Sequence, residues 1–274
     1  MKAGIAPITL VPVEEAGESG GTRIHRILGR PVRGDRISAL VSQWKGPDDT
    51  TMEARYVDAS FETPVVRSNG TTVIHILWAD EPESRPIWAG KDGSEDSRLT
   101  PWVVAPGDTI TIPSGAPYRI GAGVIAFTLE IRDRRETIET DWQILPPTHG
   151  LHLFHRFNRR TICSATPGLV LERWKLTHPL NLGLDATRWH YLTNLVTPVA
   201  LGWMGGTELV GRTDSRLLPP GLERITLVPG GLGYVLLGYV PHLEADVIAP
   251  LRGAGYDAGA IAALGVPREM LKPK

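Results

Sequence analysis

The sequence predicts an all-β protein of two tandem units, in a pattern typical of barrels or sandwiches, with a small helical extension at the C-terminus. Strand-like runs rich in β-branched and aromatic residues recur along the 274 residues. Glycine (30 residues) and proline (23 residues) are spread over the whole chain, which is typical of many short strands joined by turns. The length also suits two domains, since domains cluster near about 100 to 150 residues.

The predicted strands share alternating apolar positions and turn residues at their ends. They are Arg36–Trp44, Thr71–Trp78, Trp102–Val104, Thr109–Ile112, Val124–Ile131, Leu169–Leu176, Ala200–Met204, Ile225–Val228 and Tyr234–Val240. Two alanine-rich segments, Leu243–Leu251 and Asp257–Leu264, predict helices on either side of a glycine turn.

A repeated pattern divides the chain into two units. Pro106–Gly115 (PGDTITIPSG) reads as a turn, an alternating strand and a second turn, and Pro220–Gly231 (PGLERITLVPGG) repeats this order. We therefore expect five parts: a flexible lead over residues 1–21, a first barrel over 22–145, an inter-barrel segment over 146–168, a second barrel over 169–242 and a helical cap over 243–274.

Composition narrows the classes of function. Lysine and arginine number 29 against 30 aspartates and glutamates, so no basic field favours nucleic acid as a partner. Cys163 is the only cysteine, which favours a reducing cytoplasm. No apolar run approaches the roughly 20 residues that cross a bilayer, so we expect no membrane association. Exposed barrel edges favour a homodimer.

The Pro106–Ile131 stretch (PGDTITIPSGAPYRIGAGVIAFTLEI) resembles the hairpin that rims the active site of class I mannose-6-phosphate isomerases. Thr72–Gly90 (TVIHILWADEPESRPIWAG) is similar to that family's preceding strand, turn and return strand. These enzymes are bicupins, so the resemblance implies two cupin barrels, each a double-stranded β-helix or jelly roll. It also implies aldose-ketose isomerisation of a sugar phosphate and a zinc ion.

Zinc in that family is held by a glutamine, two histidines and a glutamate. Tyr118 stands where the resemblance places the hairpin histidine, and Thr72 stands where it places the glutamate. No histidine occurs between His25 and His75, so the glutamine-x-histidine pair is not matched. Zinc is thus implied by the family while its ligands are not retained, and a protein without a metal is the alternative. We expect Thr72 and Tyr118 to contact substrate.

Two charged residues are candidates for catalysis. Glu130 matches a glutamate that lies in the family's active site, and it shares a strand face with Thr128. Arg119 stands beside the lost histidine, where a fixed cation would bind a phosphate or carboxylate. Glu130 as base and Arg119 as electrophile would permit isomerisation without a metal. The alternative is that both are surface residues, with Glu130 opening a charged loop at Arg132–Glu136.

The segment His149–Arg160 (HGLHLFHRFNRR) concentrates three histidines and three arginines. We expect Arg156 and Arg159 to bind an anionic substrate, while packing between the barrels is the alternative. A metal site of His149, His152 and His155 is disfavoured, because neighbouring members of this spacing face opposite sides of a strand. His75 likewise lies on the strand face opposite Thr72.

Two functions follow. The first is a mannose-6-phosphate isomerase-like protein of sugar-phosphate metabolism. The second is a catalytically inactive cupin that binds a sugar, a sugar phosphate or another small anion as a sensor or regulatory module. The sequence leaves open whether the protein is an enzyme, because fold resemblance alone does not carry function.

Overall fold

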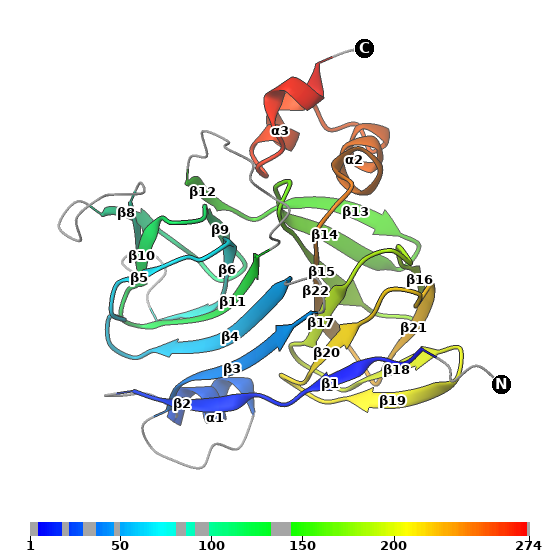
Figure 1. The fold of residues 1–274 in the computed structure, drawn as a ribbon, viewed down its shortest axis with the longest axis horizontal. Coiled ribbons are helices and arrows are strands. Elements are labelled where there is room, and N and C mark those ends of the chain that lie inside the picture. The colour runs from blue at the N-terminus through cyan, green and yellow to red at the C-terminus, as the bar shows by residue number, and fades with distance from the viewer. Residues whose placement is uncertain are drawn as a thin grey trace.

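The computed structural model describes residues 5–17, 22–29, 37–46, 50–80, 86–90, 99–132 and 144–272. Two β-rich halves lie side by side, and a group of short helices caps them at one end (Figure 1). Of the charged loop expected at Arg132–Glu136, Arg132 is the last residue of a strand and residues 133–136 lie outside the described residues.

The first half pairs a seven-stranded sheet with a four-stranded one. In spatial order the large sheet contains β12 (Leu145–Thr148), β9 (Thr109–Ile112), β6 (Thr71–Ala79), β11 (Val124–Arg132), β4 (Thr51–Ala59), β3 (Ile37–Lys45) and β2 (Val13–Ala16). The small sheet contains β5 (Val66–Arg67), β10 (Pro117–Ile120), β7 (Pro86–Ala89) and β8 (Thr100–Val103). All these pairings are antiparallel.

The second half repeats this arrangement. Its large sheet contains β1 (Ile8–Leu10), β20 (Ser215–Leu218), β17 (His190–Asn194), β22 (Gly233–Tyr239), β15 (Val170–Leu176), β14 (Asn158–Ala165) and β13 (Leu151–His155). Its small sheet contains β16 (Leu180–Gly183), β21 (Arg224–Pro229), β18 (Val199–Trp203) and β19 (Gly206–Val210). Strands β2 to β11 of the first half correspond one by one to strands β13 to β22 of the second half. Corresponding strands occupy the same place along the chain and the same place in their sheets.

This shared topology corrects the alignment of the sequence repeat. The strand of Pro106–Gly115 is β9, which lies in a large sheet, whereas the strand of Pro220–Gly231 is β21, which lies in a small sheet. The counterpart of β9 is β20, and that of β10 is β21. The duplication is therefore real but shifted by one strand, because similar proline-glycine turns occur on both sides of β9.

Two expected connecting segments are strands instead. The predicted flexible lead contains β1, which pairs with β20 of the second half, and β2, which pairs with β3 of the first half. The predicted inter-barrel segment contains β13 and β14 of the second large sheet. Both segments were misassigned because charged residues interrupt their apolar alternation, although the backbone still pairs into ladders.

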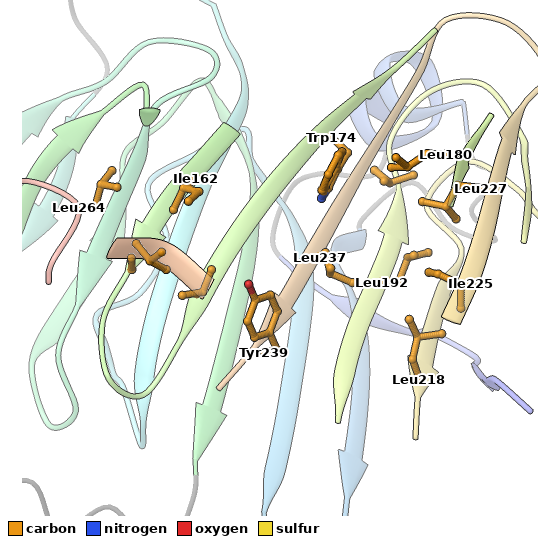
Figure 2. Close-up of a cluster of buried hydrophobic side chains, with 14 of the residues drawn as sticks. Ile162, Trp174, Leu180, Leu192, Leu218, Ile225, Leu227, Leu237, Tyr239 and Leu264 are labelled. Carbon is orange, nitrogen blue, oxygen red and sulfur yellow. The ribbon is translucent and has the colours of Figure 1, made fainter. Parts of the chain in front are cut away.

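Three apolar cores hold the layers together. One fills the space between the sheets of the first half around Ile74, Ile110 and Val124. A second lies between the two large sheets, where Phe127 stacks near Tyr191 with ring centroids 5.9 Å apart. The third fills the second half and continues into the C-terminal helices (Figure 2). The two halves are therefore joined by a shared core as well as by the crossing strand β1.

Helices are short and mostly terminal. They are α1 (Thr22–Leu28), the π-helical turn η2 (Glu244–Ile248), α2 (Ala249–Gly253), α3 (Ala258–Ala262) and the 3-10 turn η3 (Arg268–Leu271). Within the described ranges, none of the helices has the length and apolar character needed to cross a membrane. The prediction of a mostly β protein is confirmed. The described ladders do not close either half into a barrel, so two closed barrels stay a prediction.

Candidate functional site

A cavity of about 1050 Å³ opens in the first half between its two sheets. Strands β2, β3, β4, β10 and β11 and the segment that follows β4 line it. Its charged lining residues within the described ranges are Glu15, Glu53, Arg55, Asp58, Glu62, Arg67 and Glu130. Five carboxylates and two guanidinium groups thus line it, and two of the carboxylates, Asp58 and Glu62, are paired with Arg23 and Arg119 from outside the lining.

Strand β4 places a carboxylate and a guanidinium group on the cavity side. Met52, Ala54 and Tyr56 pack into the core between the halves, so alternation turns Glu53 and Arg55 the other way. The Arg55 guanidinium is held from two sides: Nε lies 2.6 Å from Glu53 Oε1, and Nη1 lies 2.7 Å from Glu15 Oε2. Arg55 therefore fixes the positions of two carboxylates of the lining.

Glu130 enters the cavity from β11. Its Oε2 accepts a hydrogen bond from Thr72 Oγ1 at 2.9 Å and another from the Asn69 backbone N–H at 3.2 Å. Burial raises the pKa of Glu130 above its usual value; the two hydrogen bonds oppose this rise, and the charge of Glu53 adds to it. Thr72 is only 1% exposed and does not itself line the cavity. It lies behind Glu130 and positions the carboxylate.

Tyr118 enters from β10 and is 9% exposed. Burial and the negative charge of Glu130 raise the pKa of its phenol, which keeps the hydroxyl neutral and able to donate a hydrogen bond. Three predicted site residues, Thr72, Tyr118 and Glu130, are thus brought together at one cavity.

The three predicted arginines are not part of this lining. Arg119 alternates with Tyr118 on β10, lies 4.9 Å from the Trp88 ring centroid, and places Nε 3.1 Å from Glu62 Oε1. The structure does not bring it together with Glu130 in the lining. Arg156 is exposed at the β13–β14 turn with φ of 56°, and Arg159 lies on β14 of the second half.

The histidines considered for metal binding are also dispersed. His75 is buried on the opposite face of β6, as expected, where Nδ1 lies 2.8 Å from Thr109 Oγ1. His149 Nδ1 lies 3.0 Å from Asp108 Oδ1, and His155 packs against the Trp174 ring. Among the described residues, no three histidine, cysteine, aspartate or glutamate side chains gather in a way that could hold a metal ion.

The residues of the cavity also fail to fit a zinc ion of the family's kind. Glu53 and Arg55 lie two residues apart on β4, which pairs with β11, the strand of Glu130. A guanidinium group has no lone pair to offer a metal and is always positively charged. It would repel a cation while it engages the nearest carboxylate, so the donor set disagrees with the zinc that the resemblance implies.

Sequence reasoning missed Glu53, Arg55 and Glu15. Residues 51–59 were not recognised as a strand, because polar side chains normally mark the solvent face and here they point into a cavity. The alternation of Met52, Ala54 and Tyr56 with Glu53, Arg55 and Val57 was the signal that could have found the strand.

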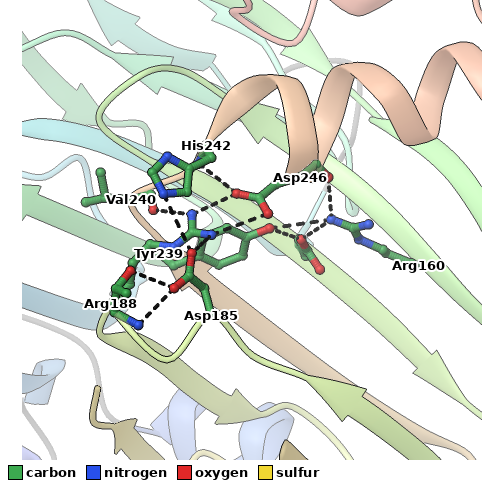
Figure 3. Close-up of polar contacts among 9 residues, drawn as sticks. Arg160, Asp185, Arg188, Tyr239, Val240, His242 and Asp246 are labelled. Carbon is green, nitrogen blue, oxygen red and sulfur yellow. Dashed lines mark hydrogen bonds and ion pairs between the residues drawn. The ribbon is translucent and has the colours of Figure 1, made fainter. Parts of the chain in front are cut away.

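A second cavity of about 460 Å³ lies in the second half, against the C-terminal helices. Buried Glu172 accepts a hydrogen bond from Arg160 Nη2 at 2.5 Å, another from Trp174 Nε1 at 2.9 Å, and a third from the Tyr239 hydroxyl. Figure 3 shows that Arg160 also reaches the backbone of Asp246, whose carbonyl oxygen lies 2.9 Å from Nη2.

Arg188 forms the other part of this network. Its Nη1 lies 2.7 Å from Asp246 Oδ2 and 2.8 Å from the Val240 carbonyl oxygen, and its Nη2 lies 2.7 Å from Asp185 Oδ2 (Figure 3). The carboxylates here are thus occupied by arginine, and the contacts fasten the helical end of the chain to the second half. Sequence reasoning did not single out this network, because its members are distant in the chain.

Comparisons with solved structures define the fold class. The mannose 6-phosphate isomerase from Bacillus subtilis aligns with a TM-score of 0.65 and 11% identity over 85% of this chain and 99% of that chain. A protein described as a putative mannosephosphate isomerase from Archaeoglobus fulgidus aligns at 0.56 and 15% identity over 85% and 99%. Oxalate decarboxylase from Bacillus subtilis aligns at 0.53 and 8% identity over 74% and 72%.

The chain therefore has a cupin-type fold, as its sequence resemblance implied. No protein-family model and no curated protein matches it. At these identities the likeness defines the fold alone, and the chemistry has to be argued from the side chains of this chain.

Proposed function

We propose that the cavity of the first half binds a neutral sugar or a similar polyhydroxylated molecule without a metal ion. The observation that carries this proposal is the set of fixed carboxylates in the lining, of which Glu53 and Glu15 are oriented by Arg55 and Glu130 by Thr72. Oriented carboxylates accept strong hydrogen bonds from hydroxyl groups. The volume is slightly above the usual range for small-molecule pockets, about 300 to 1,000 Å³.

The charge of the lining disfavours a phosphate ester. A dianionic group would meet the Glu130 carboxylate, and Arg55, the guanidinium group beside it, already engages Glu53 and Glu15. A neutral sugar avoids this repulsion. Tyr118 adds a hydroxyl donor at the same cavity, so acceptors and a donor are both present for a molecule with many hydroxyls.

Isomerisation of a sugar phosphate has weaker support. It needs an electrophile at the carbonyl, and the predicted electrophile Arg119 lies outside the described lining beside Trp88. Glu130 retains the position and raised pKa of a candidate base, which is the observation in favour of catalysis. The catalytically inactive binding protein is therefore the function that the geometry favours.

The test is thermal unfolding of the full chain with neutral hexoses, pentoses and polyols, and in parallel with mannose 6-phosphate and fructose 6-phosphate. Each is tried in EDTA and in zinc, and a coupled isomerase assay runs on the same samples. A neutral sugar should raise the unfolding temperature equally in EDTA and in zinc, without turnover. Stabilisation by phosphate esters alone, or zinc-dependent turnover, would refute the proposal.

Two variants locate the binding site. Tyr118→Phe and Glu130→Gln should each weaken binding of the stabilising sugar by about tenfold, the usual effect of losing one hydrogen bond to a charged or buried group. Arg119→Gln is the matched control, because Arg119 is the neighbour of Tyr118 on β10 but is not among the residues that line the cavity. Equal losses in all three variants would place the sugar elsewhere.

A further inference from the structure

One face of the strands β13, β14 and β15 carries two neighbouring rows of side chains that include two arginines and a lysine. One row consists of His152, Thr161 and Arg173, and the next consists of Phe154, Arg159 and Lys175. Leu151, Leu153 and Trp174 of the same strands pack into the core of the second half, so alternation puts both rows on the other face. We call His152, Arg159, Arg173 and Lys175 the basic strip.

Strand pairing brings the members of the strip side by side, and one hydrogen bond joins two side chains of the first row. His152 Nδ1 lies 3.0 Å from Thr161 Oγ1, between the two arginines. Burial lowers the pKa of His152, and the positive charges of Arg159 and Arg173 lower it further. On adjacent strands, diagonal neighbours such as Arg159 and Arg173 are about 7 to 8 Å apart, which is within joint reach of their guanidinium groups.

The strip ends where the two halves meet. Arg173 Nη1 lies 3.4 Å from Nε2 of His75, which belongs to β6 of the first half. It also faces the turn before β9, since a Cβ atom added to Gly107 would lie 3.2 Å from Arg173 Nη1. Gly107 has φ of 94°, so the turn keeps its backbone open toward the arginine.

The cations of the strip have no carboxylate partners in the part of the chain that the structure describes. Asp108, the acid at the neighbouring turn, is engaged by His149 at 3.0 Å. Arg159 Nε is buried without a hydrogen bond. By contrast, Arg160, one residue further along β14 and on the other face, is paired with Glu172. Partial burial removes water from these guanidinium groups, and no protein anion offsets that cost. An anion bound from solution would offset it.

We propose that the basic strip is a second binding site, which takes a small molecule carrying one or two phosphate groups. Arg159 and Arg173 supply planar donors that match phosphate oxygens, and Lys175 adds a third positive charge. The site is distinct from the sugar cavity and does not depend on it. The two proposed sites also differ in the charge of their ligands. The cavity of the first half takes a neutral molecule, whereas the basic strip on the second half takes an anion.

Isothermal titration of the full chain with inorganic pyrophosphate tests the proposal, at 50 mM and 200 mM sodium chloride. We expect saturable binding that weakens with salt and competes with inorganic phosphate. Arg159→Gln and Lys175→Gln should each lower the affinity about tenfold, the effect of losing a charge-assisted hydrogen bond. Both variants leave the Arg173–His75 contact in place, so the two halves stay joined, and thermal unfolding verifies this.

Arg224→Gln is the matched control, since Arg224 is exposed on β21 of the small sheet and its replacement changes the net charge equally. It should leave pyrophosphate binding unchanged, as should Glu130→Gln in the sugar cavity. Absence of binding at millimolar pyrophosphate would overturn the proposal. So would equal weakening by Arg159→Gln and Arg224→Gln, which would indicate attraction to overall charge.

Discussion

Replacing Arg160 with methionine is expected to destabilise the protein strongly. Arg160 Nη2 lies 2.5 Å from Glu172 Oε1, and the Glu172 side chain is 3% exposed. Methionine keeps the length and apolar stem of the side chain but leaves a buried carboxylate without its counterion. Removing one partner of a buried ion pair costs about 3 to 5 kcal/mol. A shift of about 2 to 4 °C per kcal/mol then gives a fall in Tm of roughly 6 to 20 °C.

Part of that loss should be recovered by removing the charge. In the double variant Arg160→Met/Glu172→Gln, the glutamine still accepts a hydrogen bond from Trp174 or Tyr239, but no charge is buried. Residues in one network show coupling energies of about 0.5 to 3 kcal/mol, so the double variant should be more stable than Arg160→Met alone. Urea denaturation of the four proteins in the cycle measures this.

The matched control is Arg252→Met at the surface of α2. The Arg252 and Glu244 side chains are 40% and 51% exposed and lie 3.9 Å apart, so the change should cost less than about 1 kcal/mol. The argument fails if Arg160→Met costs no more than this control. It also fails if the two changes of the cycle are additive, since the buried charge would then not be the cause.

Three further outcomes are expected. Because the pKa of Glu130 is raised in the folded protein, ionisation of this carboxyl group opposes folding. Glu130→Gln should therefore be more stable than wild type at pH 8, and this gain in stability should disappear below about pH 4. A difference between the two proteins that does not change with pH in urea denaturation would contradict this. Burial, together with the charge of Arg173, lowers the pKa of His75 to about 3, so the folded protein holds the imidazole neutral. As pH falls from 6.5 toward 3, the free energy of unfolding should therefore decrease by up to about 1.4 kcal/mol per pH unit. His75→Asn should reduce this pH dependence in urea denaturation, and an unchanged pH dependence would show that other groups cause it. Gly150→Ala should cost at least about 2 kcal/mol by thermal unfolding, because φ is 77° and the added Cβ would lie 2.4 Å from the Ile162 carbonyl oxygen; Gly253→Ala, with nothing within 4 Å, is the control expected to be neutral or stabilising.

Much of the β framework could be predicted from the sequence, because those strands alternate apolar and polar residues between turn residues. The strand over Thr109–Ile112 was placed with its observed bounds, and Val124–Ile131 differs from β11 by one residue. Ile8–Leu10 could not be predicted, because three residues carry little periodicity and their partner β20 lies about two hundred residues later in the chain. Its pairing depends on topology that no local pattern encodes.

The candidate site could be predicted only in part, for a related reason. Tyr118, Thr72 and Glu130 were found because the hairpin motif fixes their spacing. Arg55 was missed, since its strand carries polar side chains toward a cavity and apolar ones toward the other half, the reverse of the usual surface strand. Arg159 was selected from the density of charge around it, but its place on the sheet of the second half depends on strand pairing.

The repeated topology explains how the two halves can carry different chemistry on one framework. Equivalent strand pairs set Thr72 against Glu130 in the first half and His190 against Tyr239 in the second. In the first half this rung borders a cavity with an excess of carboxylates, whereas in the second Arg160 and Arg188 neutralise the carboxylates and tie them to the C-terminal helices. Burial lowers the pKa of His190 to about 4, so the imidazole adds no charge at neutral pH. The same strand order thus carries a cavity lined by Glu53, Arg55 and Glu130 in the first half and an arginine–carboxylate network in the second.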